Sequence, residues 1–480
     1  MKNTSILTLT LFLFTVVLFS RCSQENDPVD SAKPNVIFIM ADDLGYGDVG
    51  VYGQERIQTP RLDQMAEQGL KFTQFYAGTS VCAPSRSSLI TGLTTGHTEI
   101  RGNLQNGRRN GQQPLSAGTY TIAKLMKEAG YTTGMIGKWG LGNPNTSGNP
   151  LRHGWDFFYG YTDQVLAHNY YPEYLWKNNE KVFLDNEVNY LDTSAWHGGL
   201  GSYSTQKREY SGDLLFEEAE AFIQRNQDTP FFLYLPITAP HDNGEQPDSM
   251  RFEVPDQGIY EDRPWPKTHK DYAAMITRMD SCIGALLDQL DRLGLAENTL
   301  ILFTSDNGPF NNHPTTDFFD SNGPLRGAKR DLYEGGMREP MIARWTGKIE
   351  PNTTSDHLGA FWDLMPTLAE LVGVAPPENT DGISFVPTLL GETEQKEHAH
   401  LYWEFHEGTG SQAIRQGKWK AVRTDAITHP EGGLELYDLS TDLGESQNLA
   451  DEYPEKVREL DSLMTASRTH SDLFPFGRDD

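Results

Sequence analysis

Four short apolar runs, each ending in polar residues, dominate the hydrophobic pattern of the chain. They are rich in β-branched or aromatic side chains and cover residues 35–40, 133–137, 231–235 and 299–303. Hydrophobicity that is continuous rather than alternating is typical of strands buried on both faces, as in a parallel sheet. Amphipathic helical patterns lie between and beside them, at residues 59–67, 121–129, 214–225 and 272–293. This alternation predicts an α/β layered fold.

Polar side chains suited to chemistry follow the four runs, at the points where the predicted strands end. They are Asp42 and Asp43 after the first run, Lys138 after the second, His241 a short turn after the third, and Asp306 and Asn307 after the fourth. Because ligands of α/β folds gather at the carboxyl ends of the strands, we expect these side chains to form one site. The aspartates and the asparagine offer oxygen ligands, which suit Ca²⁺ or Mg²⁺ rather than Zn²⁺. The pattern favours a metal-assisted hydrolase, and helix caps or plain turns are the alternative for each pair taken alone.

A cysteine at a predicted helix start is the second candidate for chemistry. In the run Cys82-Ala83-Pro84-Ser85-Arg86, the proline suits the first turn of a helix, and Arg86 lies one turn after Cys82. The unpaired N–H groups of the helix start and the guanidinium are both able to hold an anion beside the thiol. The alternative interpretation is an ordinary buried thiol near a helix start.

The chain is strongly acidic. Its 480 residues include 40 Lys and Arg against 67 Asp and Glu, which gives a net charge of −27. Such a charge argues against nucleic acid or an anionic membrane surface as a partner. A site for an anionic substrate must therefore be a local group of lysine, arginine, histidine and metal charge within an acidic surface.

The N-terminus has the pattern of an export signal. Met1-Lys2 precedes an apolar run over residues 6–19, which is short for a membrane span, and Cys22 follows directly. The arrangement resembles a bacterial lipoprotein signal over residues 1–22, although Arg21 departs from the usual small residue before the acylated cysteine. We expect a polar tether over 23–33, a lipid anchor on Cys22 as the membrane contact, and a periplasmic or cell-surface location. Apart from Cys22 and Cys82 the chain has Cys282, in an apolar helical pattern, so no disulfide framework is expected.

The cysteine run and five further blocks resemble type I, formylglycine-dependent sulfatases. The blocks occur in the family's order, at residues 34–47, 82–92, 130–142, 231–241, 300–308 and 325–340. The resemblance implies an alkaline-phosphatase-like fold, with a large mixed, mostly parallel sheet between helices and a small C-terminal antiparallel sheet. It implies that a maturation enzyme oxidises Cys82 to Cα-formylglycine. It also implies one Ca²⁺ ion, held by Asp42, Asp43, Cys82, Asp306 and Asn307.

The same resemblance implies a catalytic role for six residues. The hydrated aldehyde at position 82, a gem-diol, is the nucleophile that attacks sulfur. The others are Asp306, which accepts the proton of the nucleophile, Arg86, which steadies it, Lys138 and Lys329, which bind sulfate, and His241, which serves the leaving group. One position departs from the family, because Gly137-Lys138-Trp139-Gly140 has glycine where Gly-Lys-Trp-His is usual. That histidine normally contacts the gem-diol, and the sequence identifies no replacement for Gly140.

Aromatic and amide residues that follow the block with Lys138 suggest a sugar substrate. Residues 153–161 and 168–172 resemble bacterial carbohydrate sulfatases that act on galactose- or N-acetylgalactosamine-containing glycans, which favours exo-acting removal of O-sulfate. His168 is the leading candidate substrate contact, followed by His313 and His406. Core packing is the alternative for most of the aromatics, and an ordinary loop position is the alternative for the histidines.

Pro376-Pro377 marks a predicted boundary between a catalytic domain, residues 34–375, and a C-terminal subdomain, residues 376–480. Short strands are predicted at 399–405, 411–414, 419–422 and 434–437, and a helix at 454–467. Two other functions remain open on the sequence. One is a phosphonate or phosphate ester hydrolase of the same superfamily, and the other is a catalytically impaired, glycan-binding lipoprotein.

Overall fold

The computed structural model describes residues 33–103, 112–191, 201–310 and 313–476. Residues 34–480 form one compact unit, and the account below concerns that unit alone. The predicted signal segment and Cys22 lie outside the described residues. No helix within the described ranges is long and apolar enough to cross a membrane.

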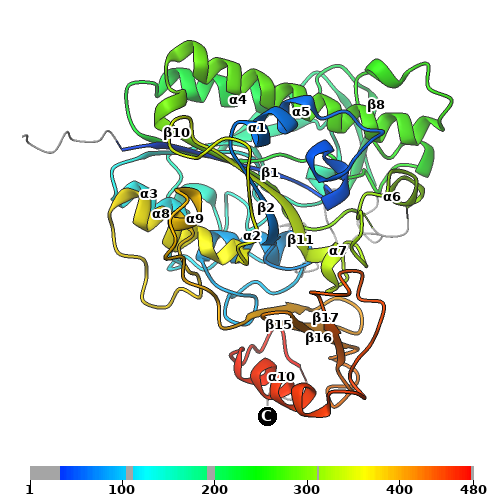
Figure 1. The fold of residues 1–480 in the computed structure, drawn as a ribbon. Helices are drawn as coiled ribbons and strands as arrows, with labels where there is room; N and C mark the ends of the chain where they lie inside the picture. Colours follow the sequence, from blue (N-terminus) through cyan, green and yellow to red (C-terminus); the bar gives the residue numbers. More distant parts are fainter. Residues whose placement is uncertain (1–32, 104–111, 192–200, 311–312, 477–480) are drawn as a thin grey trace, which may run out of the picture. The chain divides into compact units, whose positions relative to one another are not determined.

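An eleven-stranded mixed sheet runs through the described residues (Figure 1). Its order is β12-β2-β11-β10-β1-β9-β3-β4-β5-β6, with β13 paired to β2. The five central strands are parallel, namely β10 (Thr299–Ser305), β1 (Asn35–Ala41), β9 (Phe231–Pro236), β3 (Thr132–Lys138) and β4 (Phe157–Tyr161). The flanking strands are β2 (Leu70–Tyr76), β5 (Tyr174–Lys177), β6 (Glu180–Phe183), β11 (Arg338–Arg344), β12 (Thr353–Ser355) and β13 (Gly359–Ala360). All four strands expected from the continuous apolar runs are therefore confirmed, and they lie in the parallel centre.

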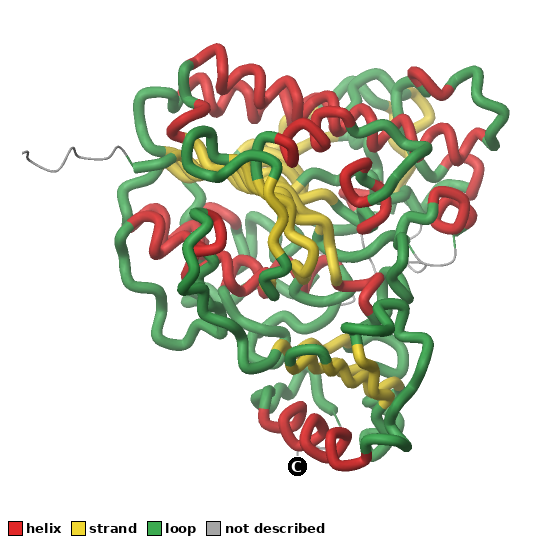
Figure 2. The backbone as a smooth tube through the Cα atoms, viewed as in Figure 1, coloured by secondary structure: helices red, strands yellow, loops and turns green. Residues whose placement is uncertain are grey.

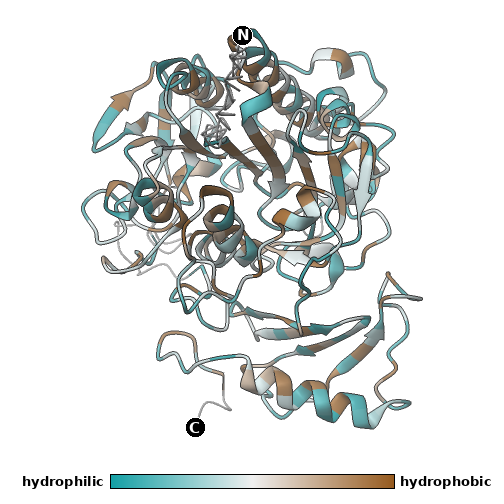
Figure 3. Cartoon of the chain, turned by 60° about the vertical axis from the view of Figure 1, so that its left-hand side comes forward, coloured by the Kyte–Doolittle hydropathy of each residue, from teal (hydrophilic) through white to brown (hydrophobic). Residues whose placement is uncertain are grey.

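Helices cover both faces of this sheet, as the tube in Figure 2 shows. In β1, Ile37 and Ile39 pack on one face, while Val36 and Phe38 pack on the other. The first face is covered by α1 (Pro60–Glu67), α4 (Ser211–Arg225) and α5 (Lys267–Leu293). The second face is covered by α2 (Cys82–Thr91), α3 (Ile122–Glu128), α8 (Leu364–Val372) and α9 (Val386–Leu389). Hydrophobic positions follow the central strands and the inner sides of these helices (Figure 3), which confirms the α/β layered prediction.

The aromatic run at residues 153–161 is mainly part of the core. Residues 157–161 form β4, and Trp155, Phe158 and Tyr161 are buried. The Trp155 ring stacks on Phe232 and Tyr234 of β9, which β3 separates from β4 in the sheet. The core-packing interpretation therefore holds for Trp155, Phe158 and Tyr161, because all three side chains are buried in or beside β4.

A separate antiparallel sheet follows in the chain, as expected. It consists of β14 (Leu401–Phe405), β15 (Ser411–Gln416), β16 (Trp419–Thr424) and β17 (Glu435–Asp438). Helix α10 (Pro454–Ala466) packs Leu460 and Met464 into a small cluster with Ile414 and Leu436. The remaining described strands form a two-stranded ribbon of β7 (Glu187–Tyr190) and β8 (Ser202–Gln206). The remaining described α-helices are the short α6 (Pro314–Phe319) and α7 (Glu334–Met337).

A buried lysine ties the small sheet to the large one. Lys420 of β16 is fully buried, and its Nζ lies 2.9 Å from Glu334 Oε1 of α7 and 2.9 Å from Glu445 Oε1. Glu334 also accepts hydrogen bonds from Tyr76 Oη, at 2.5 Å, and from Arg338, at 3.2 Å. The charges of Lys420, Arg415 and Arg338 outweigh the effect of burial and hold the pKa of Glu334 near 2.

Replacing Lys420 with alanine is expected to lower the free energy of unfolding by about 3–5 kcal/mol, because the buried carboxylates of Glu334 and Glu445 lose the lysine that they share. Urea denaturation followed by circular dichroism measures this change. Lys418→Ala is the matched control, because Lys418 lies directly before β16 and pairs with Asp438 of β17, but its side chain is about half exposed. A loss for Lys420→Ala no larger than that of the control would contradict the expectation.

Candidate active site

Four strand ends bring the predicted residues together at one edge of the sheet. Asp42 and Asp43 follow β1, and its neighbour β10 ends directly before Asp306. The backbone N–H groups of Asp42 and Asp306 donate to Ala239 O and Ala41 O, both at 3.1 Å, which joins the turns after β9, β1 and β10. Lys138 is the last residue of β3, and His241 follows the turn after β9. The structure therefore brings the residues after the four strands together, and their action as one site stays a prediction.

The cysteine begins helix α2 and faces this edge. Cys82 Sγ lies 3.5 Å from Asp42 Oδ1, and the residue is 3% exposed. Arg86, one turn later, donates from Nη2 to Asp306 Oδ2 at 2.7 Å and from Nη1 to Lys138 O at 2.7 Å. Ser85 Oγ donates to Asp306 O at 2.6 Å. The helix start is thereby fastened to the ends of β10 and β3, which fixes the position of Cys82.

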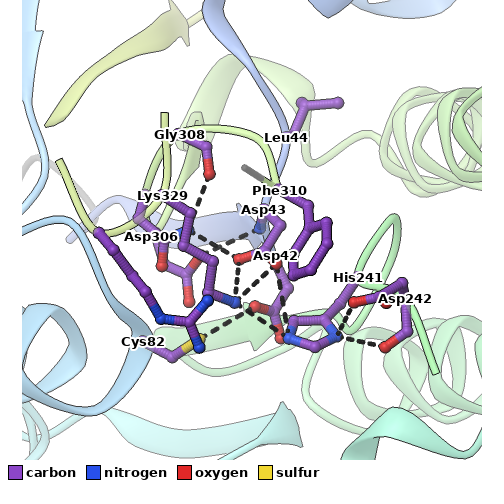
Figure 4. A network of polar contacts seen from close by, with 12 residues as sticks. Asp42, Asp43, Leu44, Cys82, His241, Asp242, Asp306, Gly308, Phe310 and Lys329 are labelled. Atoms are coloured by element: carbon purple, nitrogen blue, oxygen red, sulfur yellow. Dashed lines mark hydrogen bonds and ion pairs between the residues drawn. The ribbon is translucent and has the colours of Figure 1, made fainter. Parts of the chain in front are cut away.

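Two lysines neutralise the two aspartates after β1, and Figure 4 shows one of them, Lys329, beside Asp43. Lys138 Nζ donates to Asp42 Oδ2 at 2.7 Å. Lys329 Nζ lies 2.7 Å from both carboxylate oxygens of Asp43 and 3.1 Å from His241 Nε2. All five residues are buried, so the interactions are only weakly screened by solvent. The site therefore contains the local group of positive charge that an anionic substrate requires in this acidic chain.

The pKa values follow from burial and from these charges. Burial alone would raise the pKa of Asp42, but Lys138, His241 and Arg86 hold it below its usual value. Burial and the neighbouring Asp42 raise the pKa of Asp306 to about 6, against the effect of Arg86. Burial raises the pKa of the Cys82 thiol to about 12, although Lys138 and Lys329 oppose the rise. A thiol of this pKa stays protonated near neutral pH, so unmodified Cys82 would be a weak nucleophile.

The residues present fit a hard cation. Ligand atoms of Asp42, Asp43, Cys82 and His241 all lie within 4.8 Å of one another. The asparagine predicted as a ligand is adjacent: Asn307 Nδ2 donates to Asp43 Oδ1 at 2.7 Å, while its buried Oδ1 has no hydrogen-bond partner in the described residues. Buried carboxylate oxygens beside an unsatisfied amide oxygen are the ligands that Ca²⁺ prefers.

Asp306 Oδ1, the remaining predicted ligand, accepts from the Asp43 backbone N–H at 3.2 Å. Asp43 itself has a φ of 63°, in the left-handed region that few residues other than glycine, asparagine and aspartate adopt. This backbone turns the second aspartate toward Lys329 while the first faces Lys138 and Cys82. Of the five predicted ligands, Asp42, Asp43 and Cys82 belong to the group within 4.8 Å, and Asp306 and Asn307 contact it through Asp43. Their role in binding Ca²⁺ stays a prediction.

His168 lies beside His241, the histidine predicted to serve the leaving group. Its ring stacks on that of His241, with centroids 4.5 Å apart and planes 14° apart. His168 Nδ1 lies 3.2 Å from Glu245 Oε2, whose side chain is fully buried. The sequence did not indicate Glu245, because it lies in a polar loop that lacks any motif and reaches His168 only through folding. The Glu245 carboxylate orients the His168 imidazole through Nδ1, and His168 Nε2 takes no part in this contact.

The two weaker histidine candidates lie in packed surroundings. His313 caps α6: its Nδ1 bonds Thr315 Oγ1 at 2.6 Å, and its ring packs against Phe252 and Phe310. His406 Nε2 lies 2.7 Å from Glu404 Oε2, and its ring stacks on Phe476. These contacts account for both side chains, and a role in substrate binding stays a prediction for each.

Cationic side chains and cation ligands around one buried cysteine suit the hydrolysis of an anionic ester. Comparison with known proteins narrows this class. The sulfatase family model matches residues 34–374, and the model for the C-terminal part of N-sulphoglucosamine sulphohydrolase matches residues 327–469. The chain belongs to the sulfatase family and is a sulfuric ester hydrolase.

Relatives match almost the whole chain. An N-acetylgalactosamine-6-O-sulfatase of Bacteroides thetaiotaomicron is 30% identical over 536 residues, which covers 98% of this chain and 100% of the relative. Arylsulfatase A of Homo sapiens is 34% identical over 466 residues, which covers 90% of this chain and 87% of the relative. The solved structure of Ps i-CgsB is 28% identical with a TM-score of 0.73, covering 91% of this chain and 94% of that one. A structure from work on glycosaminoglycan metabolism by Bacteroides thetaiotaomicron is 27% identical with a TM-score of 0.72, covering 92% and 100%. The expected family and its alkaline-phosphatase-like fold are confirmed.

Proposed function

We propose that this sulfatase removes O-sulfate groups from the ends of a sulfated glycan and favours sugars of the galactose or N-acetylgalactosamine type. The observation that carries the proposal is the Glu245–His168–His241 arrangement. It holds an oriented imidazole against the histidine of the leaving group, where the sugar ring of a sulfate ester must lie. The name of the Bacteroides thetaiotaomicron relative that spans this chain supports the same class of sugar.

In the proposed reaction, formylglycine at position 82 supplies a hydrated aldehyde as nucleophile. Asp42, Asp43, Asp306 and Asn307 would hold Ca²⁺, which would supply positive charge to polarise the sulfate. Lys138 and Lys329 lie where their ammonium groups neutralise the sulfate oxygens. Asp306, whose pKa is raised to about 6, accepts a proton from the attacking hydroxyl and remains fixed by Arg86. Arg86 thus acts on the nucleophile through both the helix start and Asp306.

His241 protonates the departing sugar oxygen in this proposal. Burial and the adjacent Lys329 lower the pKa of His241 well below 6.5, so its imidazole is neutral in the substrate-free site. A bound sulfate ester brings negative charge next to the ring and favours the imidazolium form. Nδ1 is held 2.7 Å from Asp242 O, which leaves Nε2 to face Lys329 and the site.

The test is release of inorganic sulfate, measured by ion chromatography, from a panel of 6-sulfated monosaccharides and short glycans. N-acetylgalactosamine 6-sulfate should be hydrolysed with a higher kcat/KM than its C4 epimer, N-acetylglucosamine 6-sulfate. Sulfate appearing only from terminal residues of an oligosaccharide supports exo action. Matched phosphate and phosphonate esters assayed in parallel separate the sulfatase from a phosphoryl-ester hydrolase, and preferred hydrolysis of those esters would contradict the proposal.

Replacing His168 with alanine is expected to raise KM for the sugar sulfate about 10–100-fold, because a buried polar pocket loses its contact to a sugar hydroxyl. Hydrolysis of 4-nitrophenyl sulfate, which lacks that hydroxyl, should change by less than about threefold. Glu245→Gln should have a smaller effect in the same direction, and His429→Ala, at an exposed position, is the control. Equal losses on both substrates would remove His168 from sugar recognition.

We further propose that the protein is exported and anchored through a lipid on Cys22, and that a formylglycine-generating enzyme matures Cys82. The signal-like segment before Cys22 and the cysteine run support these two steps. Globomycin, which blocks lipoprotein signal processing, should leave the uncleaved precursor in a producing bacterium. Normal processing in its presence would contradict the anchor.

A further inference from the structure

The carboxamide of Gln164 occupies the space above Gly140, the position that departs from the family pattern. Gly140 has a φ of +72°, a backbone conformation that residues with side chains rarely adopt. A Cβ added to Gly140 would lie 3.0 Å from Gln164 Nε2 and 3.1 Å from its Cδ. The chain therefore has no room for a larger residue at 140 while Gln164 stays in place.

The amide nitrogen of Gln164 is an unused donor. The residue is 8% exposed, and its buried Nε2 has no hydrogen-bond partner within the described part of the chain. Buried donors are almost always satisfied in folded proteins, so an unpaired one requires an explanation. A ligand that binds beside it and offers an oxygen is such an explanation.

The backbone that carries Gln164 is held firmly. Its N–H donates to Gln112 Oε1 at 3.0 Å, and Gln112 Nε2 donates to Thr162 O at 2.7 Å. Asp163 Oδ1 accepts from the N–H groups of Val165 and Leu166, at 2.9 and 3.0 Å, and so starts the turn that follows. These bonds hold the backbone at position 164, from which the side chain extends to Gly140.

The surroundings of this segment point to the sulfate site. Gly140 follows Lys138 by two residues, and Trp139 between them is buried in the core on the α3 side. Lys138 itself meets Asp42 through Nζ at 2.7 Å. Burial raises the pKa of Asp163, the residue before Gln164, and the nearby charges of His168 and Lys138 oppose that rise. Four residues after Gln164, His168 stacks on His241. The loop that carries Gln164 thus contacts the chain after β3 at Gly140 and leads directly to His168 beside His241.

We propose that Gln164 Nε2 donates a hydrogen bond to an oxygen of the sulfate group bound between Cys82 and Lys138. This inference rests on the proposed function, because it needs a sulfate at that place. An amide neither gains nor loses a proton near neutral pH, so Gln164 binds the anion and does not act as the base that a histidine at 140 would provide. The expected contribution is that of one preorganised donor to a charged oxygen.

Gln164→Leu, which keeps the shape and removes the donor, tests the proposal. The dissociation constant for inorganic sulfate, measured by isothermal titration calorimetry on the matured protein, should rise about tenfold. The kcat/KM for a sulfate ester should fall about 10²-fold. Gln164→Glu places a carboxylate beside the anion and should raise the dissociation constant and lower kcat/KM further. Gln289→Leu is the matched control, because Gln289 is a buried glutamine of α5 that donates to Glu220 O, and it should change neither quantity by more than about twofold.

Thermal unfolding establishes which variants are folded. Gln164→Asn, which withdraws the same amide by one methylene, provides the sulfate-binding measurement if the leucine variant does not fold. Unchanged sulfate affinity in a folded Gln164 variant, with wild-type protein that binds and hydrolyses normally, would overturn the inference and leave the proposed function intact. Wild-type protein that carries formylglycine but neither binds sulfate nor hydrolyses a sulfate ester would overturn both.

Discussion

Replacing Cys82 with alanine is expected to reduce kcat/KM for every sulfate ester by about 10⁵-fold, the scale on which removal of a nucleophile acts in hydrolases. The residue at position 82 is the first of α2, is held by Arg86 and Ser85 against the ends of β3 and β10, and faces Asp42 at 3.5 Å. No other described cysteine lies at this site, since Cys282 belongs to the far helix α5. Activity should therefore disappear rather than decline.

Cys282→Ala is the control for that experiment, because it removes the other described thiol from a partly buried position on α5. Its kcat/KM should match that of the wild type within about twofold. Thermal unfolding of Cys82→Ala should show a folded protein, because the deleted sulfur has one polar contact in the described structure. A folded Cys82→Ala variant with more than about 1% of wild-type activity would contradict a nucleophile at this position.

Replacing His241 with alanine is expected to lower kcat for a sugar sulfate by about 10²–10⁴-fold, the range typical of a lost general acid. The loss should be far smaller for 4-nitrophenyl sulfate, because nitrophenolate leaves without protonation. The structure gives His241 the position for this role, since Nε2 faces Lys329 at 3.1 Å and the ring packs on His168.

The ratio of the two losses is the informative quantity for His241. Steady-state kinetics with both substrates on the same preparation gives it directly. His400→Ala serves as control, because its ring bonds Ser467 and its loss should affect neither substrate. Equal losses on the two esters would show that His241 supports the fold or the cation site and does not protonate the leaving group.

The central strands could be predicted because they are buried on both faces. The runs that became β1, β3, β9 and β10 are continuously apolar. Their order in the sheet, β10-β1-β9-β3, differs from their order along the chain and comes only from the fold. Strand β2 escaped prediction because its pattern Leu70-Lys71-Phe72-Thr73-Gln74-Phe75-Tyr76 mixes polar and apolar positions, as befits a strand nearer the edge. Strand β11 carries Arg338, Glu339 and Arg344, charges that only the folded sheet shows to be buried.

The residues of the site also fall into those that the sequence predicts and those that only the fold reveals. Side chains that stand directly after apolar strands, such as Asp42, Asp306 and Lys138, could be found from sequence because parallel strand ends share one edge. The partners that orient them could not. Glu245 and Gln164 lie in polar loops without a motif, and they reach His168 and Gly140 only through contacts that the three-dimensional fold creates.

The remaining alternative, a glycan-binding protein without catalysis, makes a distinct prediction. Such a protein would bind sulfated glycans with Cys82 unmodified and would release no sulfate. The raised pKa of the buried Cys82 thiol, about 12, gives an unmodified cysteine little nucleophilic character in either case. The chemical state of residue 82 therefore decides between the two functions.

The most direct measurement is peptide mass spectrometry across Cys82, combined with kcat on the same samples. Conversion of the thiol to the aldehyde lowers the peptide mass by about 18 Da. Preparations matured to different extents should have kcat values proportional to the fraction of converted peptide, with an intercept at zero. Hydrolysis that persists in protein whose Cys82 is fully unmodified, or converted protein that releases no sulfate from any ester, would contradict the account.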